Sequence, residues 1–207
     1  MSESYTQQIK NKIDQSPAGT VFIHSDFARI AGTETVRRSL NRFTQTGHLR
    51  RILNGVYEKP KYSSLLHEYV AVNPDAVANA IARNYHWTIV PCGDSALNLL
   101  GLSTQVPAVW VYVSDGPYRK YSCGNTAIEF RHRTNREISG LSYMTRLLVQ
   151  ALKALGKEQI TQEVISFLSD KLTSEEKRAA LQEAAFCLFM AEGGLLAYAK
   201  GYGLYYK

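Results

Sequence analysis

Basic and amide side chains recur on one side of a helix that the sequence predicts over residues 33–47. Val36, Leu40 and Phe43 are spaced i, i+4 and i+7, which predicts that they form its buried face. An isolated basic face is usually only solvated. In the major groove, however, Arg pairs with guanine, and Asn or Gln with adenine, through two hydrogen bonds each. The side chains away from the core therefore favour contact with DNA, and the candidates are Thr35, Arg37, Arg38, Asn41, Arg42 and Gln45.

A β-hairpin is predicted directly after this helix. Residues 48–53 alternate as a strand does, Asn54-Gly55 is typical of a tight hairpin turn, and residues 56–58 form the return strand. Arginines on the first strand suit DNA phosphates or a narrow minor groove. The hairpin thus adds three candidates to the DNA-binding set, which are Arg50, Arg51 and Asn54.

The helices and strands predicted before the basic helix complete the element order of a known domain. Apolar residues at four-residue spacing from Tyr5 to Ile13 predict a first helix, residues 20–23 a short strand, and residues 25–31 a second helix. Helix, strand, helix, tight turn, helix and hairpin is the order of a winged helix-turn-helix. The sequence therefore predicts such a DNA-binding domain over residues 1–62.

Positive charge is concentrated in this first domain. Residues 1–62 hold ten Lys or Arg and five Asp or Glu, whereas residues 63–207 hold fourteen and thirteen. A basic domain beside a nearly neutral one indicates a polyanionic partner, nucleic acid before a membrane surface. No apolar run approaches the roughly 20 residues of a membrane span, and the first residues lack the apolar region of a secretory signal. We expect a cytoplasmic protein without a membrane partner.

For residues 63–207 the sequence predicts a mixed α/β domain with a small antiparallel sheet and a C-terminal helical bundle. The expected fold class of the whole chain is therefore α+β. Residues 63–85 are expected to be mainly helical. The remaining strands are predicted at 87–90, 108–113, 119–122 and 126–132, and the helices at 94–100, from 141 onward, at 162–168 and at 173–190. The aromatic tail over 201–207 is expected to dock on this domain.

The second domain shows no catalytic or metal-binding spacing. Asp94 and Ser95 follow a predicted strand, but no GxSxG motif surrounds them, so we expect them to cap the next helix. The five histidines are scattered, and the three cysteines form no CxxC pair. We therefore expect neither an enzyme, nor a metal site, nor a cofactor.

A second basic cluster lies around the predicted sheet of this domain. Two explanations remain open, which are a solvated face of the sheet and a second contact with DNA or RNA. The cluster consists of Arg119, Lys120, Arg131, Arg133 and Arg136.

The stretch GTVFIHSDFARIAGTETVRRSLNRFTQTGHLRRILNGVYEKP resembles the N-terminal winged helix of AbiEi-type antitoxins of bacterial abortive-infection systems. The later stretches ALNLLGLSTQVPAVWVYVSDG and IEFRHR are similar to the C-terminal domain of that family, so the resemblance spans roughly residues 5–190. It implies a transcriptional repressor that binds inverted repeats in its own operator. It also implies an antitoxin role in antiviral defence, against a nucleotidyltransferase-like toxin of a type IV system with which it forms no stable complex.

Two other functions remain open. One is a defence effector whose second domain acts on nucleic acid, and the other is a winged-helix regulator without a toxin partner. A nucleotidyltransferase gene overlapping or directly following this one would favour the antitoxin.

Overall fold

The chain is an α+β protein in this computed structural model, which describes residues 3–133 and 140–190. It divides into two compact units. Of the described residues, the first contains 3–87 together with 119–129, and the second contains 88–118, 130–133 and 140–190. This division differs from the expected boundary after residue 62. Among the described residues, no helix is both long and apolar enough to cross a membrane.

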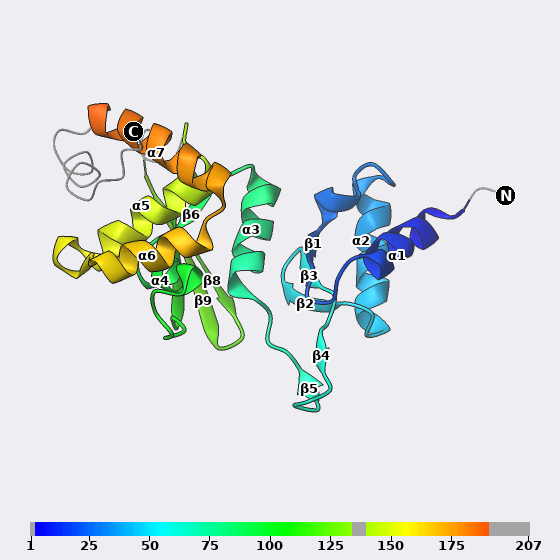
Figure 1. The fold of residues 1–207 in the computed structure, drawn as a ribbon. Coiled ribbons are helices and arrows are strands. Elements are labelled where there is room, and N and C mark those ends of the chain that lie inside the picture. Colours follow the sequence, from blue (N-terminus) through cyan, green and yellow to red (C-terminus); the bar gives the residue numbers. More distant parts are fainter. Residues whose placement is uncertain (1–2, 134–139, 191–207) are drawn as a thin grey trace. The chain divides into compact units, whose positions relative to one another are not determined.

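The first unit opens with six elements that enclose one apolar core. They are α1 (Tyr5–Gln15), β1 (Val21–Ile23), η1 (His24–Phe27), α2 (Thr33–Gln45), β2 (Arg50–Leu53) and β3 (Val56–Glu58). The three strands form an antiparallel sheet in the order β1-β3-β2. In Figure 1, α1 and α2 lie side by side. The core between helices and sheet is made of Ile9, Ile13, Phe22, Phe27, Val36, Leu40, Phe43, Leu49 and Tyr57.

The helical segment after β1 is shorter than the sequence predicts. The predicted helix over 25–31 is a 3₁₀ turn, η1, followed by further turns. The Asp26 carboxylate accepts a hydrogen bond from the Ile23 backbone N–H, and Ala28 N–H donates to Ser25 O. Ile30 N–H likewise donates to Phe27 O. These i→i+3 hydrogen bonds make a tighter turn than an α-helix does, and the Phe27 side chain is nevertheless buried.

Residues 63–73 are not helical, contrary to expectation. The strands β4 (Tyr62–Ser63) and β5 (Glu68–Tyr69) form a small hairpin, residues 70–73 have no regular structure, and helix α3 begins only at Pro74 (Pro74–Tyr85). His67 has a φ of 53°, which interrupts a helix, and Pro74 disfavours helical backbone in the residue before it. Pro74 instead occupies the first turn of α3, where its missing N–H is harmless.

Helix α3 packs against β1, which explains why the first unit extends beyond the expected boundary. Arg83 Nη2 donates to Val21 O at 3.2 Å and lies 3.3 Å from Asp26 Oδ2. The unit also includes β8 (Arg119–Cys123) and the start of β9 (Thr126–His132).

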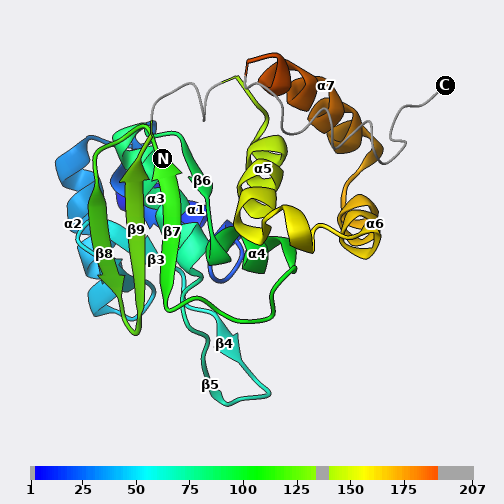
Figure 2. The ribbon, with the colours of Figure 1, turned by 90° about the vertical axis from the view of Figure 1, so that its left-hand side faces the viewer.

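The second unit places helices around short strands. Its further elements are β6 (Ile89–Pro91), α4 (Asp94–Leu100), β7 (Val109–Ser114), α5 (Tyr143–Leu155), η3 (Lys157–Gln159), α6 (Gln162–Lys171) and α7 (Ser174–Met190). The strands β6, β7, β9 and β8 are hydrogen-bonded in that order (Figure 2). Helix α5 packs against α4 and β6. Their shared core contains Val90, Ala96, Leu100, Val113, Leu147, Ala151 and Leu168.

Side chains at helix ends tie the second unit together. Thr173 and Glu176 form the expected capping box of α7, since each side chain accepts from the other residue's backbone N–H. Gly101, with a φ of 72°, ends α4. Lys171 Nζ donates to Leu100 O at 2.7 Å, and a Cβ at position 101 would come within 2.5 Å of that nitrogen.

Candidate nucleic-acid interface

Helix α2 separates a buried face from a cationic one, as its periodicity predicts. Val36, Leu40 and Phe43 are buried, and so is Ser39, whose Oγ lies 3.4 Å from Thr6 Oγ1 of α1. Every predicted DNA-binding residue of this helix is exposed, namely Thr35, Arg37, Arg38, Asn41, Arg42 and Gln45.

Glu34, in the first turn of α2, binds two of these arginines. Its Oε1 accepts from Arg38 Nε at 3.0 Å, and its Oε2 lies 3.5 Å from Arg37 Nε. All three side chains are exposed, and exposed ion pairs contribute at most about 1 kcal/mol. A phosphate group can therefore replace Glu34 as the partner of Arg37 and Arg38.

The two arginines of β2 have different surroundings. Arg51 is exposed and donates from Nη2 to Asn54 Oδ1 at 2.6 Å, beside the turn in which Gly55 has a φ of 79°. Arg50 instead donates from Nε to Glu58 Oε2 at 2.9 Å and from Nη2 to Val70 O at 3.0 Å. Glu58 is only 2% exposed. The Arg50 guanidinium is thus committed to a buried carboxylate, and this pairing was not expected.

Helix α2 and the β2–β3 hairpin face a common hollow of about 320 Å³. It brings together four of the predicted residues, which are Arg37, Asn41, Arg51 and Asn54. Thr35, Arg38, Arg42 and Gln45 are exposed on α2 but do not line it.

Five further residues line the hollow without having been predicted to bind DNA, which are His24, Thr33, Leu40, Gly55 and Tyr57. His24 of η1 lines it, and Tyr57 of β3 donates from its hydroxyl to Asn41 Oδ1 at 3.3 Å. Tyr57 lies opposite Arg51 in the β2–β3 pairing because the register shifts between Arg51 and Leu53, so regular hairpin alternation could not have placed it there. Neither Tyr57 nor His24 carried a sequence signal for this position.

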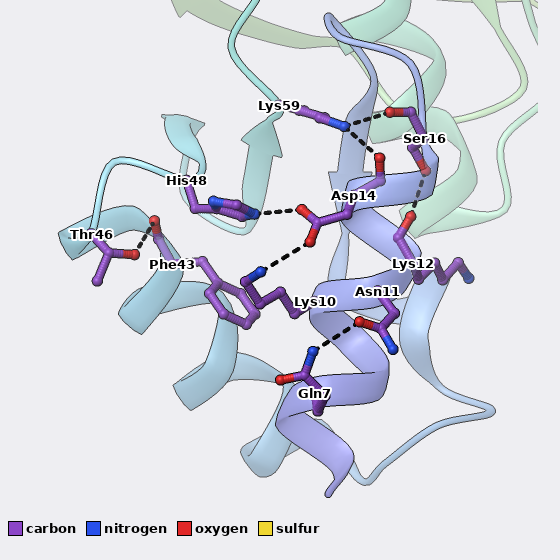
Figure 3. A network of polar contacts seen from close by, with 10 residues as sticks. All are labelled: Gln7, Lys10, Asn11, Lys12, Asp14, Ser16, Phe43, Thr46, His48 and Lys59. Atoms are coloured by element: carbon purple, nitrogen blue, oxygen red, sulfur yellow. Dashed lines mark hydrogen bonds and ion pairs between the residues drawn. The ribbon is translucent and has the colours of Figure 1, made fainter. Parts of the chain in front are cut away.

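A polar network holds the hairpin against α1 (Figure 3). His48, just before β2, donates from Nε2 to Asp14 Oδ1 at 2.6 Å, and Lys10 Nζ donates to Asp14 Oδ2 at 3.0 Å. Lys59, just after β3, donates to the carbonyl oxygens of Asp14 and Ser16 at 2.8 and 2.7 Å. Both ends of the hairpin are therefore bound to the C-terminal turn of α1. The Lys59 ammonium also complements the negative end of the helix dipole.

The second basic cluster is divided between the compact units. Arg119 and Lys120 lie exposed on β8 in the first unit, whereas Arg131 and Arg133 are exposed in the second. Arg136 and the tail over 201–207 lie outside the described residues.

Ser95 has a structural role in the second unit. It is 1% exposed, and its Oγ accepts from Val111 N–H at 2.8 Å, which links α4 to β7. Asp94 lies in the first turn of α4, after Gly93 at the N-cap position. Within the described ranges, no group of three His, Cys, Asp or Glu is arranged to hold a metal ion.

The fold and this surface define an α+β protein whose first unit presents a cationic helix face beside a hairpin. Residues 8–180 match the family described as "Family of unknown function (DUF6088)", and the chain belongs to that family. No curated protein matches the chain.

Proposed function

We propose that this protein is a DNA-binding transcriptional repressor whose elements α1 to β3 form a winged helix-turn-helix. Helix α2 is then the recognition helix, and the β2–β3 hairpin is the wing. The single observation that carries the proposal is the hollow shared by α2 and the hairpin, with Arg37 and Asn41 on one side and Arg51 and Asn54 on the other. Guanidinium and amide donors from two elements then face one duplex.

The partner in this proposal is double-stranded DNA, with inverted repeats upstream of the gene as the operator. Footprinting on the promoter DNA locates the site. Fluorescence anisotropy on that fragment then compares Arg42→Ala with the charge-matched control Arg178→Ala, which changes an arginine of α7 in the second unit. Weaker binding of Arg42→Ala, with Arg178→Ala unchanged, supports the proposal. Equal binding of the unaltered chain and both variants to any duplex contradicts it.

The antitoxin role is a further part of the proposal and rests on the resemblance to AbiEi-type antitoxins. The protein would counteract a nucleotidyltransferase-like toxin in the cytoplasm without forming a stable complex. If a nucleotidyltransferase gene overlaps or directly follows this one, the test is growth of cells that express it with and without the full-length chain. Repression without rescue of growth would leave a plain transcriptional regulator.

The second basic cluster allows two roles of the second unit to be distinguished, which are DNA contact and antitoxin action. Charge reversal at Arg131 and Arg133 changes two exposed side chains without touching the core of either unit. If the second unit contributes a contact to DNA, the double variant weakens operator binding. If it leaves binding unchanged but abolishes rescue, this surface serves the antitoxin role.

A further inference from the structure

The hairpin β4–β5 carries an unusual concentration of exposed apolar side chains. Tyr62 and Tyr69 are 54% and 62% exposed, and Leu65 and Leu66 at the tip are 87% and 63% exposed. These four lie within eight residues of sequence. We call residues 61–70 the arm, and it projects from the three-stranded sheet of the first unit (Figure 1).

The arm has a defined conformation. Tyr62 and Tyr69 are cross-strand partners whose rings meet edge to face with centroids 5.4 Å apart. Val70 N–H donates to Lys61 O, which closes the base of the arm. Arg50 then anchors this base, since it bridges the buried Glu58 and Val70 O. The structure thus fixes a hairpin whose apolar side chains face solvent.

A free hairpin of this kind lacks a stabilising partner. Two-stranded hairpins are at best marginally stable alone in water, and edge strands with open hydrogen-bonding groups favour pairing with another chain. Among the described residues, neither strand of the arm has a second strand beside it other than its hairpin partner. Tyrosine is enriched in the cores of protein interfaces, and leucine is among the residue types most often buried.

We propose that the arm is a self-association surface and that its occupant is the arm of a second copy of this chain. Each exposed Tyr or Leu side chain presents on the order of 100 Å² of apolar area. Four from each of two copies bury roughly 800 Å², and the arm backbones bring the total to about 1,000 Å², the lower bound of a specific interface. The dimer is therefore a weak, concentration-dependent one.

The distribution of charge also favours contact between two arms over contact between other faces of two first units. The excess of positive charge over residues 1–62 would make other faces of two first units repel each other. Between Tyr62 and Tyr69 the formally charged residue is Glu68 alone, so two arms approach with little repulsion. In a two-fold arrangement the same four apolar side chains meet on both sides, which is the self-complementarity of an isologous interface.

The proposal stands apart from DNA binding and is tested without DNA. Sedimentation velocity of the full-length chain, from micromolar to hundreds of micromolar, should show a shift from monomer to dimer. Leu65→Ser/Leu66→Ser should raise the dissociation constant at least about tenfold, because both side chains sit at the contact. The matched control is Val106→Ser in the second unit, an apolar residue 74% exposed, which should leave dimerisation unchanged.

Hydrogen exchange on the unaltered chain supplies a readout that needs no variant. Amides of residues 61–70 should become protected as protein concentration rises. A monomer at every concentration would overturn the proposal, as would a dimer that the double variant leaves intact. Protection of the arm that does not change with concentration would reflect hydrogen bonds within the single chain and would also contradict a second copy.

Discussion

His48 Nε2 and Asp14 Oδ1 lie 2.6 Å apart and join the end of α1 to the start of the hairpin (Figure 3). The hydrogen bond from His48, followed by that from Lys10, lowers the pKa of the Asp14 carboxyl below its ordinary value of 3.8. A carboxyl whose folded pKa is depressed contributes stability that is present above its unfolded pKa. That contribution is lost as the pH falls through the folded pKa.

Asp14→Asn should therefore destabilise the protein at pH 7 and not in strong acid. Because Asp14 and His48 are both partly exposed, we expect a loss of about 0.5–1 kcal/mol in the free energy of unfolding at pH 7. The difference from the unaltered chain should vanish below the folded pKa of Asp14. Urea unfolding at both pH values checks this, with the exposed Asp170→Asn as control. An equal loss at both pH values would show that the substitution acts through packing rather than charge.

Glu34→Gln should strengthen DNA binding. It releases Arg37 and Arg38 from their shared carboxylate and removes a negative charge from the proposed interface. We expect a severalfold rise in affinity, and the slope of log affinity against log salt should steepen by up to about 0.9 for each phosphate that a released arginine neutralises. Anisotropy titrations over a range of salt concentrations measure both, with Glu175→Gln on α7 as the matched control. Weaker binding would mean that Glu34 orients the arginines on the DNA.

Arg50→Ala and Arg51→Ala should have different consequences. Loss of Arg50 leaves the buried Glu58 without its partner and should lower the free energy of unfolding by about 1–3 kcal/mol. Loss of the exposed Arg51 should leave stability unchanged and weaken binding to any duplex. Thermal unfolding and anisotropy on each variant separate the two roles. An Arg50→Ala variant with unchanged stability and weaker binding to DNA would place Arg50 among the DNA-binding residues.

Asn41→Ala and Arg38→Ala should each reduce specific binding by about 1–3 kcal/mol and relax the preference for one base pair. The comparison is between operator and random DNA, and equal losses on both would mark these residues as phosphate contacts. Tyr57→Phe is the control for Asn41, because it removes the hydroxyl that holds the amide while leaving Asn41 in place. It should cause a smaller loss than Asn41→Ala.

Periodicity and turn chemistry predicted α2 and its hairpin because both signals are local. Val36, Leu40 and Phe43 are buried as their spacing requires, and Asn54-Gly55 makes the turn between β2 and β3. The arm was missed because its strands have two residues each, too few for an alternating pattern.

The partner of Arg50 could not be predicted for a different reason. In a regular hairpin with a two-residue turn, Leu53 opposite Val56 would place Arg51 opposite Glu58. The pairing instead shifts by one residue between Arg51 and Leu53, so that Arg50 meets Glu58 and Arg51 meets Tyr57. A single irregularity in β2 thus decides which arginine pairs with the buried Glu58 and which is exposed.

The end of α4 restricts how this chain can change over evolution. Gly101 and the Lys171 ammonium occupy adjoining space, and the lysine needs that space to reach Leu100 O. A larger side chain at 101 would meet both an unfavourable backbone conformation and the ammonium. A residue other than glycine at 101 would therefore strain the backbone and move the Lys171 ammonium away from Leu100 O, so we expect glycine at this position among relatives.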